Sequence, residues 1–546
     1  MKLEKQWIIK KALFDKTFIQ NLQIKTKLPV QLLQFLSLKG YVTEQMINKL
    51  LSPIDESNFL FYKDGKKLIE LMLTNKDKKI LIYSDFDCDG LCSAAIASYG
   101  LNSLGYQTSN YVNSRFEDGY GFKDKAIYYA LENNCQVILA LDHGISDIET
   151  IENAKKAGLT VLLIDHHIVP EKLPPADAIV DLWQQDDTSE FKSYSSGALA
   201  FQFIKALASK HNYTSGFNEL LGLVALCTIS DVMELRETNR YYIKEGLKIF
   251  NTDSLVCYKV INDKMAKALT IDDLRFVIAP QINAVGRITD DTKLVLKLFL
   301  SVNYKEAEDY YEVIRQTNQK RQLLTKIQLE MAKTQINSKD TINVIVGDFH
   351  EGLVGLLAGR IKSETGKLTI VLSKKEDILK GSIRSLEEVA LQKYLKNLSN
   401  LLISYGGHDM AAGISLYEKD LAEFSAQLKA KIKREEETTF EYLDYVYQTE
   451  HLKSTDISQW ELLEPYGPGF EYPTFGLLIQ NYRYQILKDS HIKLTTDNIT
   501  IMAFNSIGHF EKVKSGKPLK AIVRFEKDRY NNYQAILIDD NLRYYK

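Results

Sequence analysis

The chain of 546 residues lacks most features that mark specialised protein classes. It holds only 10 prolines and 28 glycines, without low-complexity tracts or fixed-period repeats, which excludes a fibrous or largely disordered chain. Its longest apolar stretch, 220–229, is about half as long as a membrane-spanning helix requires. Lysines interrupt the first residues, which have no apolar segment typical of a signal peptide. We therefore expect a soluble, cytoplasmic protein of several domains.

The chain also has few cysteines and no surplus of positive charge. The five cysteines form no C-x-x-C pair, so we expect reduced, mostly buried thiols rather than disulfides or a zinc knuckle. A net charge of −2 lacks the basic surplus common in nucleic-acid-binding proteins. Charge is unevenly spread, however, because the segment 481–546 has 12 lysines and arginines against 7 acidic residues, with aromatic residues among them. Such a segment is typical of a surface that binds a nucleic-acid backbone.

Apolar runs predict alternating strands and helices after an N-terminal helical region, 1–60. The run 79–83 is followed by an acidic turn and an amphipathic helix over 91–104, and 136–141 and 160–164 repeat the arrangement. Continuous apolar strands separated by helices indicate a parallel sheet covered on both faces.

Helical periodicity dominates the next part of the chain, about 196–336, and includes a long charged helix over 304–334. A second α/β unit begins at 342–346 and continues through 368–372. The charge run 433–437 is interpreted as a linker. The tail beyond it is rich in strands and tight turns, which fits a small barrel such as an OB-fold.

Three carboxylates, Asp85, Asp87 and Asp89, stand at alternate positions directly after the first strand. Such a group repels itself unless cations neutralise it. An EF-hand loop also begins D-x-D-x-D-G, but it needs Glu at its twelfth position, where this chain has Ile96, and a helix before it rather than a strand. For the motif taken alone, a solvated acidic turn is the alternative.

The next two strands end in the same kind of residue. Asp142 follows one of them, and Asp165, His166 and His167 follow the other. Because sites in open α/β sheets form beyond the carboxyl ends of strands, these side chains should converge. Aspartate and histidine without thiolate suit Mn²⁺ or Mg²⁺ better than structural zinc. Asp231 follows an apolar helix, and from its position alone a helix-terminal Asp bonded to backbone amides is the favoured interpretation.

The order D-x-D-x-D-G, D-H-G-I-S, D-H-H and S-D-V-M resembles the DHH phosphoesterase superfamily and, within it, the RecJ-like exonucleases. Later elements also match: N-A-V-G-R at 283–287, F-H-E-G at 349–352, G-S-I-R-S at 381–385 and G-G-H at 406–408. The resemblance extends over nearly the whole chain. It implies a 5′→3′ exonuclease that hydrolyses single-stranded DNA to mononucleotides in repair and recombination, with single-strand-binding protein as a partner.

Carried over to this chain, the resemblance implies two divalent ions, Mn²⁺ or Mg²⁺. The ligands or supporting residues would be Asp85, Asp87, Asp89, Asp142, His166 and Asp231. Asp142 would bridge the ions and His167 would face the substrate phosphate, so that the catalytic set is Asp87, Asp89, Asp142, His166 and His167. Two ions can activate a water and stabilise the leaving oxygen.

The resemblance also implies a set of substrate-binding residues: Arg115, Arg287, His350, Ser382, Arg384, Gly406, Gly407 and His408. Arginine forks onto a phosphate with two hydrogen bonds, which suits a clamp for a 5′ phosphate, although a single arginine is more often a surface ion-pair partner. Adjacent glycines allow a phosphate nest, with a plain glycine turn as the alternative. One departure concerns Tyr83, which stands where many DHH proteins have a metal-binding histidine.

The expected fold class is α/β: a DHH parallel-sheet domain and a DHHA1 α/β domain joined by a long helix, with a C-terminal OB-like β-barrel. The expected boundaries are 1–60 for a helical cap, 61–240 for the DHH domain, 241–338 for the connector, 339–435 for DHHA1 and 440–546 for the barrel. We expect a monomer that passes its substrate strand between the DHH and DHHA1 domains. The alternatives are a phosphodiesterase of dinucleotides or short oligonucleotides, whose relatives usually lack the barrel, and a non-catalytic replication scaffold, whose acid motifs would be eroded.

Overall fold

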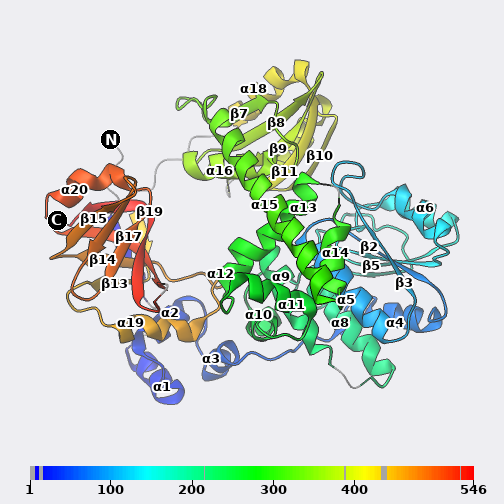
Figure 1. Cartoon of the computed structure of the whole chain (residues 1–546), viewed down its shortest axis with the longest axis horizontal. Helices are drawn as coiled ribbons and strands as arrows, with labels where there is room; N and C mark the ends of the chain where they lie inside the picture. Colours follow the sequence, from blue (N-terminus) through cyan, green and yellow to red (C-terminus); the bar gives the residue numbers. More distant parts are fainter. Residues whose placement is uncertain are drawn as a thin grey trace. The chain divides into compact units, whose positions relative to one another are not determined.

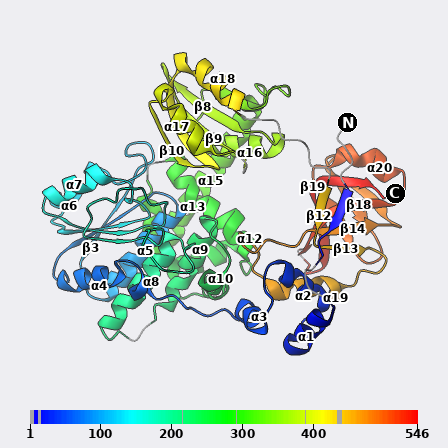
Figure 2. The same ribbon diagram turned by 180° about the vertical axis from the view of Figure 1, so that it is seen from behind.

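The structure, a computed structural model, describes residues 6–11, 16–213, 216–289, 291–386, 389–431, 440–528 and 530–545 (Figures 1 and 2). The chain divides into two compact units. The larger unit comprises Ser57–Asp231 and Glu245–Glu436, and the smaller one Met1–Glu56, Val232–Lys244 and Glu437–Lys546.

The first sheet of the larger unit has five strands, all parallel, in the order β3-β2-β4-β5-β6. Its strands are β2 (Ile80–Ser84), β3 (Thr108–Val112), β4 (Val137–Leu141), β5 (Thr160–Ile164) and β6 (Ala178–Val180). The parallel sheet predicted from the apolar runs is confirmed. Sequence reasoning missed β3, whose residues T-S-N-Y-V are mostly half-buried, and β6, which has only three residues.

Helices cover both faces of this sheet (Figures 1 and 2). One face carries α6 (Asp124–Glu132) and α7 (Ile148–Lys156), and the other carries α4 (Gly65–Thr74), α5 (Cys88–Ser103) and α8 (Ser196–Lys210). Helix α5 is buried along nearly its whole length and packs against α8. Its first turn is therefore held firmly beside the carboxyl ends of the strands.

Helices follow the sheet, as predicted. They are α9 (Leu221–Ser230), α10 (Glu237–Phe250), α11 (Val256–Met265), α12 (Ile271–Asp273), α13 (Ala279–Ile288), α14 (Lys293–Leu300) and α15 (Tyr304–Lys333), with a π-helical segment at Leu274–Ile278. The long charged helix expected at 304–334 is α15, which leads into the second sheet.

The second sheet has the order β10-β11-β9-β8-β7, and only β7 and β8 are parallel. Its elements are β7 (Asn343–Gly347), α16 (Val354–Thr365), β8 (Thr369–Lys375), β9 (Ile378–Arg384), α17 (Leu391–Asn397), β10 (Ser404–His408), β11 (Ala411–Tyr417) and α18 (Leu421–Lys431). Register aligns Ser382 with Gly413 and Gly406, and Arg384 with Ala411 and His408. These two rows lie on the same face, because residues two apart in a strand share a face.

The smaller unit joins N-terminal helices to a seven-stranded sheet through one hydrophobic core. The helices are α1 (Lys16–Thr26), α2 (Val30–Leu38), α3 (Glu44–Leu51), α19 (Ser454–Ser458) and α20 (Phe510–Lys514). The sheet, in the order β13-β14-β18-β19-β17-β16-β15, consists of β13 (Tyr445–Gln448), β14 (Phe475–Ile479), β15 (Arg483–Leu487), β16 (His491–Thr495), β17 (Thr500–Ala503), β18 (Leu519–Lys527) and β19 (Tyr533–Tyr544). Strands β1 (Gln6–Ile9) and β12 (Phe440–Leu443) pair separately.

Arg240, 1% exposed, ties separate segments of the smaller unit together. Its guanidinium donates to the carbonyls of Leu50 and Pro465 at 2.8 and 2.7 Å, and lies over the Phe470 ring. The charge run 433–437, interpreted from sequence as a linker, lies outside the described residues.

All five cysteines are free and buried, as predicted. Among the described residues, no helix has the length and apolar character needed to cross a membrane.

Candidate metal centre and phosphate site

The acidic turn after β2 begins helix α5 earlier than the sequence analysis expected. Asp87 caps this helix, because its Oδ1 accepts hydrogen bonds from the backbone N of Asp89 at 3.0 Å and of Gly90 at 3.1 Å. A Cβ at Gly90 would lie 2.5 Å from the Asp85 carbonyl oxygen, so only glycine fits there. The predicted helix start at 91 was therefore wrong by one turn, and the cap places Asp89 inside the helix.

The other acidic residues also stand at the ends of elements. Asp142 follows β4 with φ at 67°, a conformation uncommon for residues other than glycine, and its N–H donates to the Ile164 carbonyl. His166 and His167 follow β5, and Asp231 caps the C-terminus of α9.

These residues come together in three groups, and within each group one possible ligand atom per residue lies within 4.8 Å of the others. The groups are Asp85 with Asp87 and Asp142, Asp89 with His166 and Asp231, and Asp142 with His166 and His167. We call Asp85, Asp87, Asp89, Asp142, His166 and Asp231 the acidic cluster. Asp142 is the only carboxylate that occurs in two of these groups.

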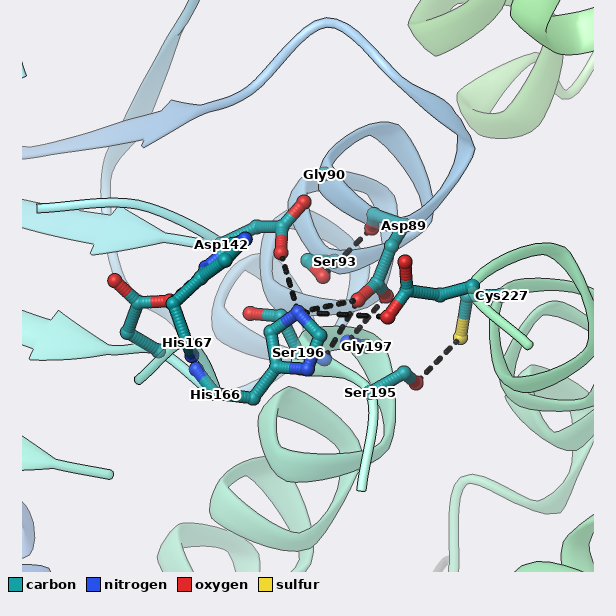
Figure 3. A network of polar contacts seen from close by, with 12 residues as sticks. Asp89, Gly90, Ser93, Asp142, His166, His167, Ser195, Ser196, Gly197 and Cys227 are labelled. Atoms are coloured by element: carbon teal, nitrogen blue, oxygen red, sulfur yellow. Dashed lines mark hydrogen bonds and ion pairs between the residues drawn. The ribbon is translucent and has the colours of Figure 1, made fainter. Parts of the chain in front are cut away.

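The His166 imidazole lies among carboxylates (Figure 3). Its Nε2 is 3.1 Å from Asp142 Oδ1, 3.6 Å from Asp231 Oδ2 and 3.7 Å from Asp89 Oδ2. Burial, together with the neighbouring His167, lowers the pKa of His166 to about 4, so the ring is neutral near pH 7. His166 therefore brings no positive charge to the carboxylates around it.

Burial and mutual repulsion raise the pKa values of these carboxyl groups. The pKa of Asp85 is raised to about 8 and that of Asp89 to about 7, in each case by burial and then by Asp87. Burial and neighbouring aspartates also raise the pKa values of Asp142 and Asp231 well above the usual range. Buried Asp85 Oδ1 has no hydrogen-bond partner among the described residues. Crowded oxygen and imidazole donors whose carboxylates repel one another fit a pair of hard divalent cations.

Asp89 is fixed by the start of helix α8. The backbone N of Ser196 donates to its Oδ2 at 2.7 Å, and that of Gly197 to its Oδ1 at 2.8 Å (Figure 3). The amino end of a helix favours a carboxylate in this position. A Cβ at Gly197 would lie 2.5 Å from Cys227 Sγ, so this approach also depends on glycine.

Asp165 is a site residue to which the sequence analysis gave no role. Its fully buried carboxylate accepts hydrogen bonds from the backbone N of His166 at 2.8 Å and of Ile145 at 3.1 Å, and lies 2.7 Å from His167 Nδ1. Burial alone would lower the pKa of His167, but Asp165 raises it to about 10. The imidazolium side chain is 44% exposed. The first letter of D-H-H, directly after a strand, was the signal that could have identified Asp165.

Three arginines from distant parts of the chain approach one another in the larger unit. Arg115 Nε donates to the Gly286 carbonyl at 2.8 Å, and Arg384 Nη1 to Ser382 Oγ at 2.8 Å. Burial and then Arg115 lower the pKa of Arg287 to about 10. None of the three forms an ion pair with a carboxylate among the described residues. We call Arg115, Arg287 and Arg384 the arginine cluster, and its unbalanced positive charge suits an anion.

The remaining predicted substrate residues lie on the second sheet and before α16. The His350 ring packs edge-on against Phe116, with 5.7 Å between ring centroids. Gly406 and Gly407 lie in the exposed edge strand β10 rather than in a turn. A Cβ at Gly407, where φ is 132°, would lie 2.4 Å from the Ala411 carbonyl oxygen. The His408 side chain lies outside the described part of the structure.

Comparison with known families finds three domains along the chain. The DHH family N-terminal domain matches residues 79–228, the DHHA1 domain 339–434 and the RecJ OB domain 443–539. The single-stranded-DNA-specific exonuclease RecJ of Haemophilus influenzae is 32% identical over 373 residues, 64% of this chain and 65% of that relative. The Bacillus subtilis protein of the same name is 28% identical over 484 residues, 84% of this chain and 60% of that relative. The chain thus spans less than two thirds of each of these two relatives.

Solved structures agree with these matches. The crystal structure of RecJ with Mn²⁺ from Thermus thermophilus superposes with a TM-score of 0.85 over 99% of this chain and 80% of that chain, at 22% identity. The crystal structure of an exonuclease RecJ bound to manganese has a TM-score of 0.61 at 28% identity, over 70% of this chain and 96% of that chain. The expected α/β fold with DHH, DHHA1 and OB domains is confirmed. The chain belongs to the RecJ family of DHH/DHHA1 phosphoesterases.

Proposed function

We propose that the protein is a metal-dependent 5′→3′ exonuclease that hydrolyses single-stranded DNA to mononucleotides, in DNA repair and recombination. The observation that carries this proposal is the presence of two buried clusters of opposite charge in the larger unit, one of carboxylates and one of arginines. The acidic cluster suits metal ions, and the arginine cluster suits a terminal phosphate. Curated relatives named single-stranded-DNA-specific exonucleases support this choice of substrate.

The acidic cluster would hold two ions, Mn²⁺ or Mg²⁺, with Asp142 as the shared ligand because it occurs in two of the three groups. Asp85 and Asp87 would complete one site, and Asp89, His166 and Asp231 the other. Bound ions would supply an activated water and neutralise charge on the scissile phosphate and leaving oxygen. Thermus thermophilus RecJ has been crystallised with each of these metals.

The side chains of this chain contribute positioning and charge. His167, kept as an imidazolium by Asp165, would bind an oxygen of the scissile phosphate. Two backbone N–H groups donate to the Asp89 carboxylate and fix its orientation toward the proposed metal site. Together with Asp87, Asp142 and His166, these residues would form the catalytic set.

The arginine cluster and Ser382 would anchor the 5′ phosphate. Because the anchor would lie at a fixed distance from the acidic cluster, the scissile bond would always be at the same distance from the 5′ end, and the products would be mononucleotides. His350, Gly406, Gly407 and His408 would contact the strand as it passes between the DHH and DHHA1 domains.

Further proposals concern the rest of the chain and its partners. Exposed Tyr484 and Phe504 in the smaller unit support a platform for stacked bases. We retain the boundaries predicted for the five segments, a monomeric state, a cytoplasmic location and single-strand-binding protein as a partner.

The test is digestion of one single strand that carries different labels at its 5′ and 3′ ends, with Mn²⁺ or Mg²⁺. We expect the 5′ label to appear at once as a mononucleotide, while the 3′ label remains on progressively shorter strands. A duplex of the same sequence should resist digestion. Initial release of the 3′ label, or cutting of dinucleotides alone, would contradict the proposal.

A further inference from the structure

Tyr83 lies at the position where many DHH proteins have a metal-binding histidine, but its hydroxyl is used elsewhere. The side chain, in β2, is fully buried. Its hydroxyl donates to Asn113 Oδ1 at 2.6 Å, lies 3.2 Å from the Gly121 carbonyl oxygen and accepts a hydrogen bond from the Lys123 backbone N at 3.0 Å. One hydroxyl therefore contacts both ends of the loop 113–123.

Asn113 strengthens this closure of the loop. It is fully buried, its Nδ2 donates to the Gly121 carbonyl at 2.8 Å and its backbone N donates to the Ser84 carbonyl at 3.1 Å. The loop thus leaves and returns to the sheet beside the end of β2. No water is needed to explain these bonds, because protein groups satisfy the hydroxyl on its donor and acceptor sides.

The loop between these two ends carries Arg115. The guanidinium lies 4.2 Å from the centre of the Phe86 ring, and its Nη1 donates to the Tyr120 hydroxyl at 2.7 Å. Since Arg115 Nε also donates to the Gly286 carbonyl, next to Arg287, the path of the loop decides whether Arg115 lies beside Arg287.

We propose that Tyr83 is a positioning residue for the terminal phosphate. Its hydroxyl closes the loop 113–123, and the closed loop presents Arg115 to the phosphate beside Arg287 and Arg384. The inference rests on the proposed function, because it assigns the arginine cluster to a 5′ phosphate. It adds a determinant of end-group preference that touches neither metal nor substrate.

A purely structural role for Tyr83 is the alternative, and one substitution separates the two. The Tyr83 ring packs against His143, Phe122 and Tyr111, with centroid distances of 4.3, 5.0 and 5.5 Å. Tyr83→Phe keeps this packing and removes only the hydroxyl. Asn113 Oδ1 and the Lys123 N–H then lose their partner, so the loop should loosen.

The experiment compares kcat/KM for a single strand with a 5′ phosphate and the same strand with a 5′ hydroxyl. In Tyr83→Phe we expect the preference for the phosphate to fall about tenfold through KM, as the loss of one charge-assisted contact predicts. Cleavage of the hydroxyl end at saturation should stay within about twofold of wild type, because the acidic cluster is untouched. Asn113→Ala should cause the same shift, and the double variant should add little to it.

The matched control is Tyr106→Phe. Tyr106 is a buried tyrosine of the same domain whose hydroxyl lies 3.0 Å from His211 Nε2 rather than at the loop. This control should leave the end preference unchanged. An unchanged preference in Tyr83→Phe, or equal losses on both ends, would overturn the inference. A wild type without any preference for the 5′ phosphate would overturn the proposed anchor as well, so the wild-type measurement alone distinguishes the two failures.

Discussion

The acidic cluster and the arginine cluster are built in contrasting ways. The acidic cluster collects residues that follow parallel strands or end a helix, so each of its motifs is contiguous in the sequence. Arg115, Arg287 and Arg384 are separated by about a hundred residues or more and meet only through the fold. Each cluster gathers buried groups of like charge, which costs free energy unless a ligand of opposite sign binds. The pair of clusters therefore supports the proposed substrate, which would bring phosphate both to metal ions and to arginines.

Removing a shared ligand should have the largest effect. Asp142→Ala should reduce hydrolysis at least about a thousandfold, since it removes a ligand from both proposed ions. Without metal, the thermal stability of the variant should hold or rise, because one of several repelling carboxyl groups is gone. Steady-state cleavage and thermal melting are the measurements. Asp186→Ala, which removes an exposed acid bonded to Lys63, is the charge-matched control. A folded Asp142→Ala protein with substantial activity would contradict the proposal that both ions share Asp142 as a ligand.

Removing an arginine should change affinity rather than chemistry. Arg384→Ala should weaken binding of a 5′-phosphorylated strand about ten- to hundredfold, the value of a forked contact between charged groups. Cleavage of a hydroxyl-ended strand should be nearly unchanged. The measurement is the ratio of cleavage rates for the two ends, with Lys374→Ala, an exposed cation paired with Glu418, as control. A ratio equal to that of wild type would count against the phosphate anchor.

The metal-free protein should lose stability as pH rises from about 6.5 to 8. Burial and repulsion raise the folded-state pKa of Asp85 to about 8 and of Asp89 to about 7, whereas both groups titrate near 4 when unfolded. The native state then binds more protons than the unfolded state, so stability falls by about 1.4 kcal/mol per pH unit for each group that stays protonated. Below about pH 6.5, His166 has the opposite effect on stability. Its folded pKa of about 4 lies below its unfolded value of about 6.5, so between these pH values its contribution to stability rises with pH.

Urea unfolding with and without Mn²⁺ tests this pH dependence. Mn²⁺ should raise the urea midpoint more at pH 8 than at pH 6.5, because protons compete with the metal for the carboxylates. A metal-free midpoint that rises between these two pH values would contradict the account.

The smallest expected effect lies in the smaller unit, where charge and aromatic rings are spread over an open edge. Removing Arg483 and Lys488 together should weaken binding of long single strands a few-fold, and should lower the slope of log affinity against log salt by about 0.7 for each charge that contacts phosphate. Cleavage of very short strands should be unaffected. Titrations at several salt concentrations measure this, and equal losses on short and long strands would indicate a folding role instead.

The contrast between the clusters also explains what could be predicted from sequence. Strands β2, β4 and β5 are apolar runs that end in acids, so the parallel sheet and the convergence of Asp85, Asp142 and His166 followed from local pattern. Strand β3 was not predicted because its half-buried residues are polar and do not form an apolar run. Helix α5 begins before residue 91 because Asp87 caps it, and the periodicity of apolar residues gives no sign of this cap.

Contacts between distant segments could not be predicted from local sequence patterns. The meeting of Arg115 with Gly286 depends on how the DHH sheet packs against α13, and only the family resemblance indicated it. The support that Asp165 gives to His167 and the closure of a loop by Tyr83 are side-chain contacts that composition and periodicity do not encode.

The most direct test of the central claim is a calorimetric titration of the metal-free protein with Mn²⁺ at pH 8, alone and with a 5′-phosphorylated oligonucleotide. We expect two ions per chain in wild type, loss of at least one in Asp142→Ala, and two ions in Arg384→Ala with weakened oligonucleotide binding. A single ion in wild type, or two ions that persist in Asp142→Ala, would contradict this claim.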